Sequence, residues 1–322
     1  MNRSVPEVRA GDRPTGLIDT LQAGFNVVNR NAWLLIIPLA LDFFLLWGPQ
    51  PSLGPSFGRL AGELASPQLP ASAAFAPGSE EARRGLVEIV ERASQVNLLS
   101  LLALPALGVP SLRASVAGEG ARIPLDSMTS VGAVVLACLV IGLTLATWFY
   151  GLLAQAVREG QTQVRRFVPD FAQTALWVLA LFALALVAVV GIAGPALVLL
   201  AAVSAAIPTG ATVLEAILVG VVLWAFVYLF FTTDALFVSG VSPLVAIQRS
   251  VRVVRHNLWS ALGLILLVVL ISTGLSMLWQ QVATNLRAPG VGLSIVGHSY
   301  ISTGLAAASM TYYKERWERL RA

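Results

Sequence analysis

The sequence predicts an all-α integral membrane protein, a bundle of about six transmembrane helices with short helices at its surfaces. The 322-residue chain is 57% hydrophobic and only 12% charged, whereas soluble domains carry roughly 25% charged residues. The apolar residues also form long runs, and about 20 apolar residues in a helix suffice to cross a hydrocarbon core of ~30 Å. The runs that we expect to cross the membrane are residues 32–48, 131–157, 172–207, 213–237, 258–280 and 291–313.

An amphipathic helix is expected ahead of the first span, within the N-terminal segment 1–31. Its apolar stripe, at helical spacing, consists of Leu17, Leu21, Phe25 and Val28. The span that follows, 32–48, is slightly shorter than the others. Because a polar and amphipathic segment precedes this span, we expect no cleaved signal peptide.

Residues 49–130 form the only sizeable segment predicted to lie outside the bilayer, as a small external helical cap. Ser79 is expected to cap a helix whose first turn holds Glu80 and Glu81, because acidic side chains there interact favourably with the helix dipole. Residues 98–109 are apolar, but they are too few to span the membrane and are interrupted by a proline. We therefore interpret them as a re-entrant or interfacial segment.

The run 172–207 is longer than one span needs, at ~50 Å if it is entirely helical. A tight hairpin broken near Pro195 would accommodate the run, but it would place the later basic loops on the opposite side of the membrane. One long helix, kinked at Pro195 and tilted or projecting outward, avoids that conflict. We therefore favour a single helix here.

Basic residues set the predicted orientation, because short loops rich in arginine and lysine stay on the cytoplasmic side. They precede the first span, occupy alternate connections and recur in the C-terminal tail 314–322. The residues concerned are Arg3, Arg9, Arg13, Arg30, Arg158, Arg165, Arg166, Arg249, Arg252, Arg255, Lys314, Arg316, Arg319 and Arg321. Both termini are therefore expected in the cytoplasm, and the protein in the cell (plasma or inner) membrane.

A second amphipathic helix is predicted over residues 242–256, where a Ser-Pro pair is typical of a helix start. Its apolar stripe consists of Leu244, Ile247, Val251 and Val254. Arg249, Arg252 and Arg255 lie away from this stripe. We therefore expect these arginines to contact anionic lipid headgroups of the inner leaflet.

The two amphipathic segments also align with each other at one constant offset. The identical pairs are Gln22 and Gln248, Val27 and Val253, Val28 and Val254, Asn31 and Asn257, and Trp33 and Trp259. Internal duplication is a known route to transporter folds. Biased composition and the shared demands of two interfacial helices would also produce such identities, so both interpretations stay open.

The sequence has no recognisable catalytic, cofactor or metal site. His256, His298 and Cys138 are its only histidines and cysteine, so a His/Cys metal site is not expected. No phosphate-binding glycine loop is present, and the basic residues map to membrane boundaries rather than to a nucleic-acid-binding surface. We therefore expect a non-enzymatic protein with no cofactor and no nucleic-acid partner, and a membrane enzyme is the least favoured alternative.

Intramembrane polar residues are the remaining candidates for a functional site. Asp42 falls near the middle of the first span, and His298 lies several residues into the sixth. An ionisable side chain at that depth is costly and usually faces the bundle interior. One hypothesis is that Asp42 and His298 pair and line a polar site. The other is that Asp42 bonds a neighbouring hydroxyl, or stays protonated, for packing alone. Asp234, near the inner end of the fourth span, is more simply explained by the membrane interface.

Two runs of sequence carry a family resemblance. They are Ser-Pro-Leu-Val-Ala-Ile-Gln-Arg-Ser at residues 242–250 and Tyr-Tyr-Lys-Glu-Arg at residues 312–316. From about residue 213 onward, the chain resembles prokaryotic polytopic proteins that are similar to the membrane domain of some bacterial glycerophosphodiester phosphodiesterases. The resemblance implies a six-helix membrane domain. The sequence has no soluble phosphodiesterase domain, so no catalytic residue carries over.

Two functions fit these observations. The first is a permease-like or lipid-interacting module that moves or holds a small or amphiphilic molecule, which Asp42, the kink at Pro195 and the possible repeat favour. The second is a structural or accessory membrane subunit that recruits partners or lipids. The basic helix 242–256 and the lack of a dense polar cluster in the sequence favour this alternative.

Overall fold

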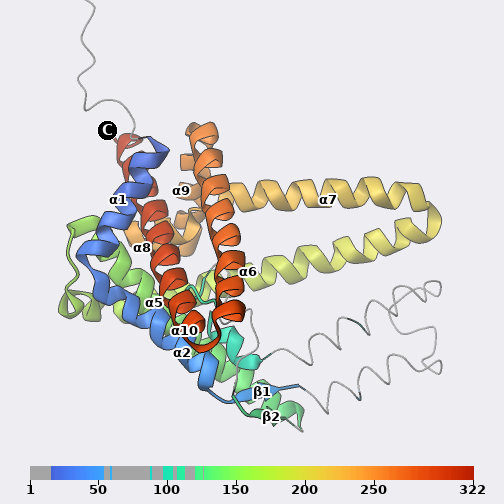
Figure 1. The fold of residues 1–322 in the computed structure, drawn as a ribbon. Helices are drawn as coiled ribbons and strands as arrows, with labels where there is room; N and C mark the ends of the chain where they lie inside the picture. The colour runs from blue at the N-terminus through green and yellow to red at the C-terminus, as the bar shows by residue number, and fades with distance from the viewer. Residues whose placement is uncertain are drawn as a thin grey trace, which may run out of the picture.

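A computed structural model of the chain describes residues 16–53, 59, 88, 97–103, 107–112, 120–125 and 127–322. Helices make up nearly all of its regular structure (Figure 1). Among the described residues, five helices are long and apolar enough to cross a membrane, or six if one bent pair counts as a span. The all-α class and the several apolar helices of a multi-pass membrane protein are therefore confirmed.

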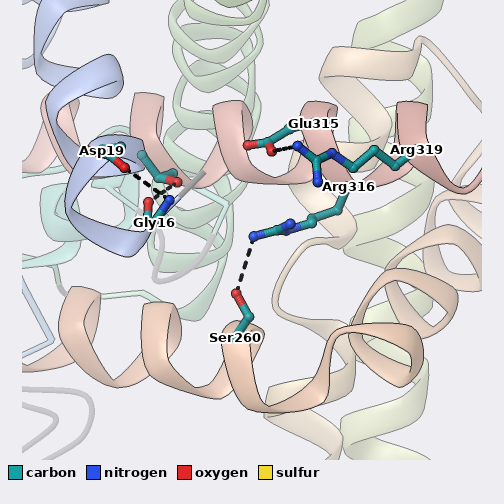
Figure 2. Close-up of polar contacts among 7 residues, drawn as sticks. Gly16, Asp19, Ser260, Glu315, Arg316 and Arg319 are labelled. Atoms are coloured by element: carbon teal, nitrogen blue, oxygen red, sulfur yellow. Dashed lines mark hydrogen bonds and ion pairs between the residues drawn. The ribbon is translucent and has the colours of Figure 1, made fainter. Parts of the chain in front are cut away.

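The longest helix, α10 (Leu258–Arg319), is a hairpin of two antiparallel legs around Pro289. We call Leu258–Leu286 leg 1 and Pro289–Arg319 leg 2. Polar contacts join the legs along their length: Ser294 Oγ donates to the Trp279 carbonyl at 2.7 Å, and Arg316 lies 3.5 Å from Ser260 Oγ (Figure 2). Half of the most apolar stretch of leg 2 is buried, more than in any other candidate span, so leg 2 lies at the centre of the bundle.

The N-terminal helix α1 (Leu17–Arg30) packs along α10. A methyl group at Gly24 would lie 2.4 Å from the backbone nitrogen of Ala308, so the two backbones are in direct contact. The predicted apolar stripe lies on the packed face of α1, where Val28 is fully buried and Leu17, Leu21 and Phe25 are partly buried. The closest contact with α10 is nevertheless made by a small residue, Gly24. The reason is that close helix packing in membranes favours small residues. Figure 1 shows α1 beside the end of α10 that carries the C-terminus.

The predicted first span is a short bent element in the structure. It consists of the 3₁₀ helix η1 (Ala32–Leu35) and helix α2 (Ile36–Trp47). The segment Ala32–Trp47 is bent by 89° relative to α1. Ala32–Trp47 is too short to count as a span by itself, and it qualifies only together with α1 as a broken span or a re-entrant loop.

The central helices are α5 (Met128–Glu159), α6 (Val164–Ala206), α7 (Pro208–Leu229) and α8 (Thr232–Ser239). Helix α6 is continuous through Pro195. Helices α6 and α7 form a hairpin that extends away from the other helices in Figure 1. Only 11% of the most apolar stretch of α6 is buried, and none of that of Gly210–Ser239, so this hairpin exposes its apolar side chains on nearly all sides.

The described part of the external segment contains two short strands that the sequence did not predict. Strand β1 (Gln50–Ser52) pairs in parallel with β2 (Arg122–Pro124). Between them lies the 3₁₀ helix η2 (Leu98–Ala103), whose Leu98 and Leu102 are buried. The helix predicted to begin at Ser79 lies outside the described residues.

Helix α9 (Pro243–His256) repeats the geometry of α1. The two helices begin and end at residues 226 positions apart, and their buried faces coincide. The equivalent buried pairs are Thr20 and Ala246, Gly24 and Ser250, and Val28 and Val254. Each helix ends at an asparagine whose side-chain amide donates to the carbonyl four residues back, at 3.0 Å for Asn31 and 3.1 Å for Asn257. The sequence alignment thus corresponds to a structural repeat.

The buried face of α9 agrees with the predicted stripe in part. Val254 is fully buried and Ile247 and Val251 are partly buried, but Leu244 is 64% exposed. The small residues Ala246 and Ser250 are also fully buried where α9 packs against α7, α8 and α10.

Candidate functional site

A non-helical segment, residues 107–112, enters the interior of the helices. Gly142 lies near the middle of α5, and a methyl group there would be 2.9 Å from the Leu102 carbonyl of η2, so the external chain reaches half-way along this span. Tyr150, further along α5, donates to the Gly108 carbonyl at 3.1 Å. Irregular backbone at membrane depth is tolerated only where protein buries it or where it lines a water-filled cavity. The described residues of this apolar segment, 98–103 and 107–109, therefore pack against the helices.

Asp42 attaches this segment to α2. Its carboxylate accepts a hydrogen bond from the Ser111 hydroxyl and one from the Leu112 backbone N–H at 3.2 Å. Asp42 is fully buried, and an ionisable group in that position needs such partners. Its observed hydroxyl partner agrees with the packing hypothesis, although that partner comes from a segment 69 residues away.

His298 does not pair with Asp42. The hydrogen-bond partners of its ring are Ser302 at 3.2 Å and Ser276 at 3.5 Å, both within α10. His298 therefore joins the two legs of the hairpin, and the hypothesis of an Asp42–His298 pair is wrong.

Asp234 of α8 is a second buried carboxylate, and it faces leg 2. Ser309 of leg 2 donates a hydrogen bond to it, and Asp234 is only 6% exposed. The interface explanation for Asp234 does not account for this burial between helices.

We call these groups the polar track. In one part of it, Asp42 accepts a hydrogen bond from Ser111, and Tyr150 donates to Gly108 of the same segment. In the other part, Ser309 donates to Asp234. Sequence reasoning missed Tyr150, Ser111 and Ser309, since none of them occurs in a motif. The sequence did contain one indication of this site, because Asp234 is an acidic residue inside an apolar run. Among the residues that the structure describes, no group of three or more His, Cys, Asp or Glu side chains could hold a metal ion.

Two of the basic residues predicted to face the cytoplasm, Arg158 and Lys314, lie together in the structure. Arg158, at the end of α5, donates to the carbonyls of Phe237 and Val238 at the end of α8. Lys314 of leg 2 donates to the carbonyls of Val157 and Arg158. Cations in these positions satisfy carbonyls that a helix end leaves unpaired. Three boundaries that are distant in sequence therefore meet at one end of the protein.

Two of the three arginines predicted to contact lipid headgroups lie at this same end. Arg249 and Arg252 lie over the ring of Trp317, with their guanidinium carbons 4.7 Å and 6.0 Å from its centroid. Arg255 is exposed and is not part of this arrangement. Trp317 is 9% exposed, and no sequence pattern connects it with α9. Each cation–π contact of this kind is worth about 0.5–1 kcal/mol at an exposed site.

The long apolar helices and the buried intramembrane carboxylates define the class: this is a multi-pass membrane protein. The chain belongs to the family described as a domain of unknown function, DUF7847, whose sequence profile matches residues 85–320. Comparisons with curated proteins and with solved structures found no match.

Proposed function

We propose that the protein is a non-enzymatic, permease-like module of the cell (plasma or inner) membrane that moves or holds a small polar or amphiphilic molecule. The observation that carries this proposal is the non-helical segment 107–112, held inside the helices by Asp42 and Tyr150. Transporter sites are commonly built where irregular backbone meets polar side chains near the bilayer midplane. The second part of the polar track adds a buried carboxylate between helices, Asp234, which accepts a hydrogen bond from Ser309 of leg 2.

The orientation in this proposal has both termini in the cytoplasm. Arg158, Lys314 and Arg249 meet at one end of the protein, which the positive-inside rule assigns to the cytoplasm. Ser111 would then lie toward the external side of the polar track and Ser309 toward the internal side. A relation to the membrane domain of glycerophosphodiester phosphodiesterases is part of the same proposal.

Thiol labelling tests whether the polar track is hydrated. Cys138 is the only cysteine, so Cys138→Ala gives a background for single cysteines at Ser111, Ser309 and the fully buried Ala146 of α5. A charged, membrane-impermeant thiol reagent should modify Ser111→Cys from outside and Ser309→Cys from inside. The Ala146→Cys control should react from neither side. If neither track position reacts in folded protein, the permease-like function is excluded.

A structural or accessory subunit is the second candidate, and the α6–α7 hairpin favours it. An apolar hairpin that its own protein leaves uncovered contacts either lipid or the helices of another membrane protein. Copurification in native lipid followed by mass spectrometry separates the two functions. A bound small molecule that is lost in Asp42→Leu supports the permease-like module, and a stoichiometric protein partner retained in that variant supports the accessory subunit.

A further inference from the structure

Three arginines from two distant parts of the chain converge on one indole ring. Arg249 and Arg252 come from α9, and Arg321 comes from the residues after α10, with its guanidinium carbon 5.7 Å from the Trp317 centroid. We call Arg249, Arg252, Arg321 and Trp317 the Trp317 cluster. Three cations around one ring repel each other, and their cation–π contacts with Trp317 offset part of this repulsion.

The described residues do not supply a carboxylate to the cluster. Glu315 pairs with Arg319 at 2.9 Å, and neither salt bridge seen among the described residues involves Arg249, Arg252 or Arg321. The buried Nε1 of Trp317 also has no hydrogen-bond acceptor in the described part of the chain. The cluster therefore concentrates positive charge without a carboxylate partner among the described residues.

Guanidinium groups suit phosphate in particular. Their planar donors form paired hydrogen bonds with phosphate oxygens, and these are among the stronger hydrogen bonds in proteins. Arg249 and Arg252 are three residues apart on a helix, a spacing that places both groups on one face. One phosphate could therefore accept from both.

The surroundings of the cluster favour a lipid as the source of that phosphate. Leu244 of α9 is 64% exposed, and Trp259, just after α9, is 84% exposed. Exposed leucine and tryptophan in and next to a helix that carries arginines are typical of a surface at headgroup depth. A phospholipid, unlike soluble phosphate, has acyl chains that cover such exposed apolar side chains.

We propose that Arg249, Arg252 and Arg321 around Trp317 bind the phosphate of an anionic phospholipid in the leaflet that this end of the protein contacts. The proposal is independent of the polar track. The sequence predicted a general attraction of α9 for anionic lipid. The proposal instead names a specific site, and Arg255 is not part of it.

The test uses the full chain in phosphatidylcholine-containing detergent micelles, with phosphatidylglycerol titrated in and bound lipid counted by native mass spectrometry. The variant carries Arg249→Ala and Arg252→Asn, because Ala23 and Asn26 occupy the equivalent positions of α1. Loss of two charge-assisted contacts should weaken phosphatidylglycerol binding at least about tenfold. The matched control is Arg255→Asn, which copies Asn29 of α1 and should stay within about twofold of the native affinity.

Each other outcome contradicts the proposal. An equal loss in the Arg255→Asn control would mean diffuse surface charge, and unchanged binding in the double variant would exclude the cluster. Inorganic phosphate is the competitor: if it displaces phosphatidylglycerol at equal concentration, the ligand is soluble phosphate and not a lipid. If the double variant fails to fold in phosphatidylcholine alone, Arg321→Gln, an exposed change near the C-terminus, takes its place and must itself reduce the affinity.

Discussion

Helices α1 and α9 have the same length, the same terminal asparagine and the same buried positions, yet they contact their surroundings differently. Helix α1 presses Gly24 against the backbone at Ala308, whereas at the equivalent position of α9, Ser250 donates to the Tyr228 carbonyl at 2.7 Å. On the outer face, α1 carries Ala23, Asn26 and Asn29 where α9 carries three arginines.

The comparison shows that backbone geometry and surface chemistry are separable in this unit. A helix that ends at an Asn-x-Trp boundary recurs, while three positions decide whether its outer face is neutral or basic. The differences between the copies also give residue swaps whose backbone context is already matched. Among these swaps we expect the largest effect at the most tightly packed position.

Replacing Gly24, the central buried residue of α1, should disrupt the packing of α1 against α10. In Gly24→Ser, which copies α9, the new side chain would overlap the backbone of Ala308, and backbone atoms cannot move aside cheaply. We expect a loss of about 3 kcal/mol in unfolding free energy, measured by thermal unfolding in detergent. The exposed Asn26→Ser on the same helix is the control and should change little. Unaltered unfolding of Gly24→Ser would show that the helices are not in backbone contact.

The terminal asparagines should differ in their contribution to stability. Asn31 donates to both Val27 and Gly160 and accepts from Thr162, whereas Asn257 donates only to Val253. We expect Asn31→Ala to cost about 2 kcal/mol and Asn257→Ala about 0.5–1 kcal/mol, since each lost hydrogen bond is worth about 1 kcal/mol. Chemical unfolding of both variants under one condition measures the difference. Equal losses would mean that the bridge to Gly160 is not formed.

Trp33 and Trp259, which follow α1 and α9, should show the smallest difference in their contribution to stability. Trp33 Nε1 donates to Thr162 at 2.8 Å, but Trp259 is 84% exposed. Trp33→Phe should therefore cost about 1 kcal/mol and Trp259→Phe almost nothing. Thermal unfolding of the two variants tests this, and a greater loss in Trp259→Phe would reverse the assignment of the two positions.

Much of the fold could be predicted from local pattern. Apolar run length identified the long helices, and the asparagines at 31 and 257 coincide with the ends of α1 and α9. The buried faces were predicted only in part, because small residues that a hydrophobic stripe does not identify also face protein. Ala246 is fully buried, whereas Leu244 of the predicted stripe is 64% exposed.

The candidate site could be predicted only in part. Burial of Asp42 follows from its position in an apolar run, but its partner Ser111 lies 69 residues away in a segment without periodicity. The same limit applies to Trp317, whose arginines come from a different helix. Pairing across such distances is set by packing, and no local spacing encodes it.

The length of α6 has a consequence for the membrane around it. Its 43 residues extend roughly 65 Å as a straight helix, compared with ~40–45 Å for a whole bilayer including headgroups. Even at a tilt of about 40°, the steep end of the usual range, the helix would exceed that thickness. The resulting hydrophobic mismatch would thicken the nearby bilayer or draw the protein toward thicker membrane regions.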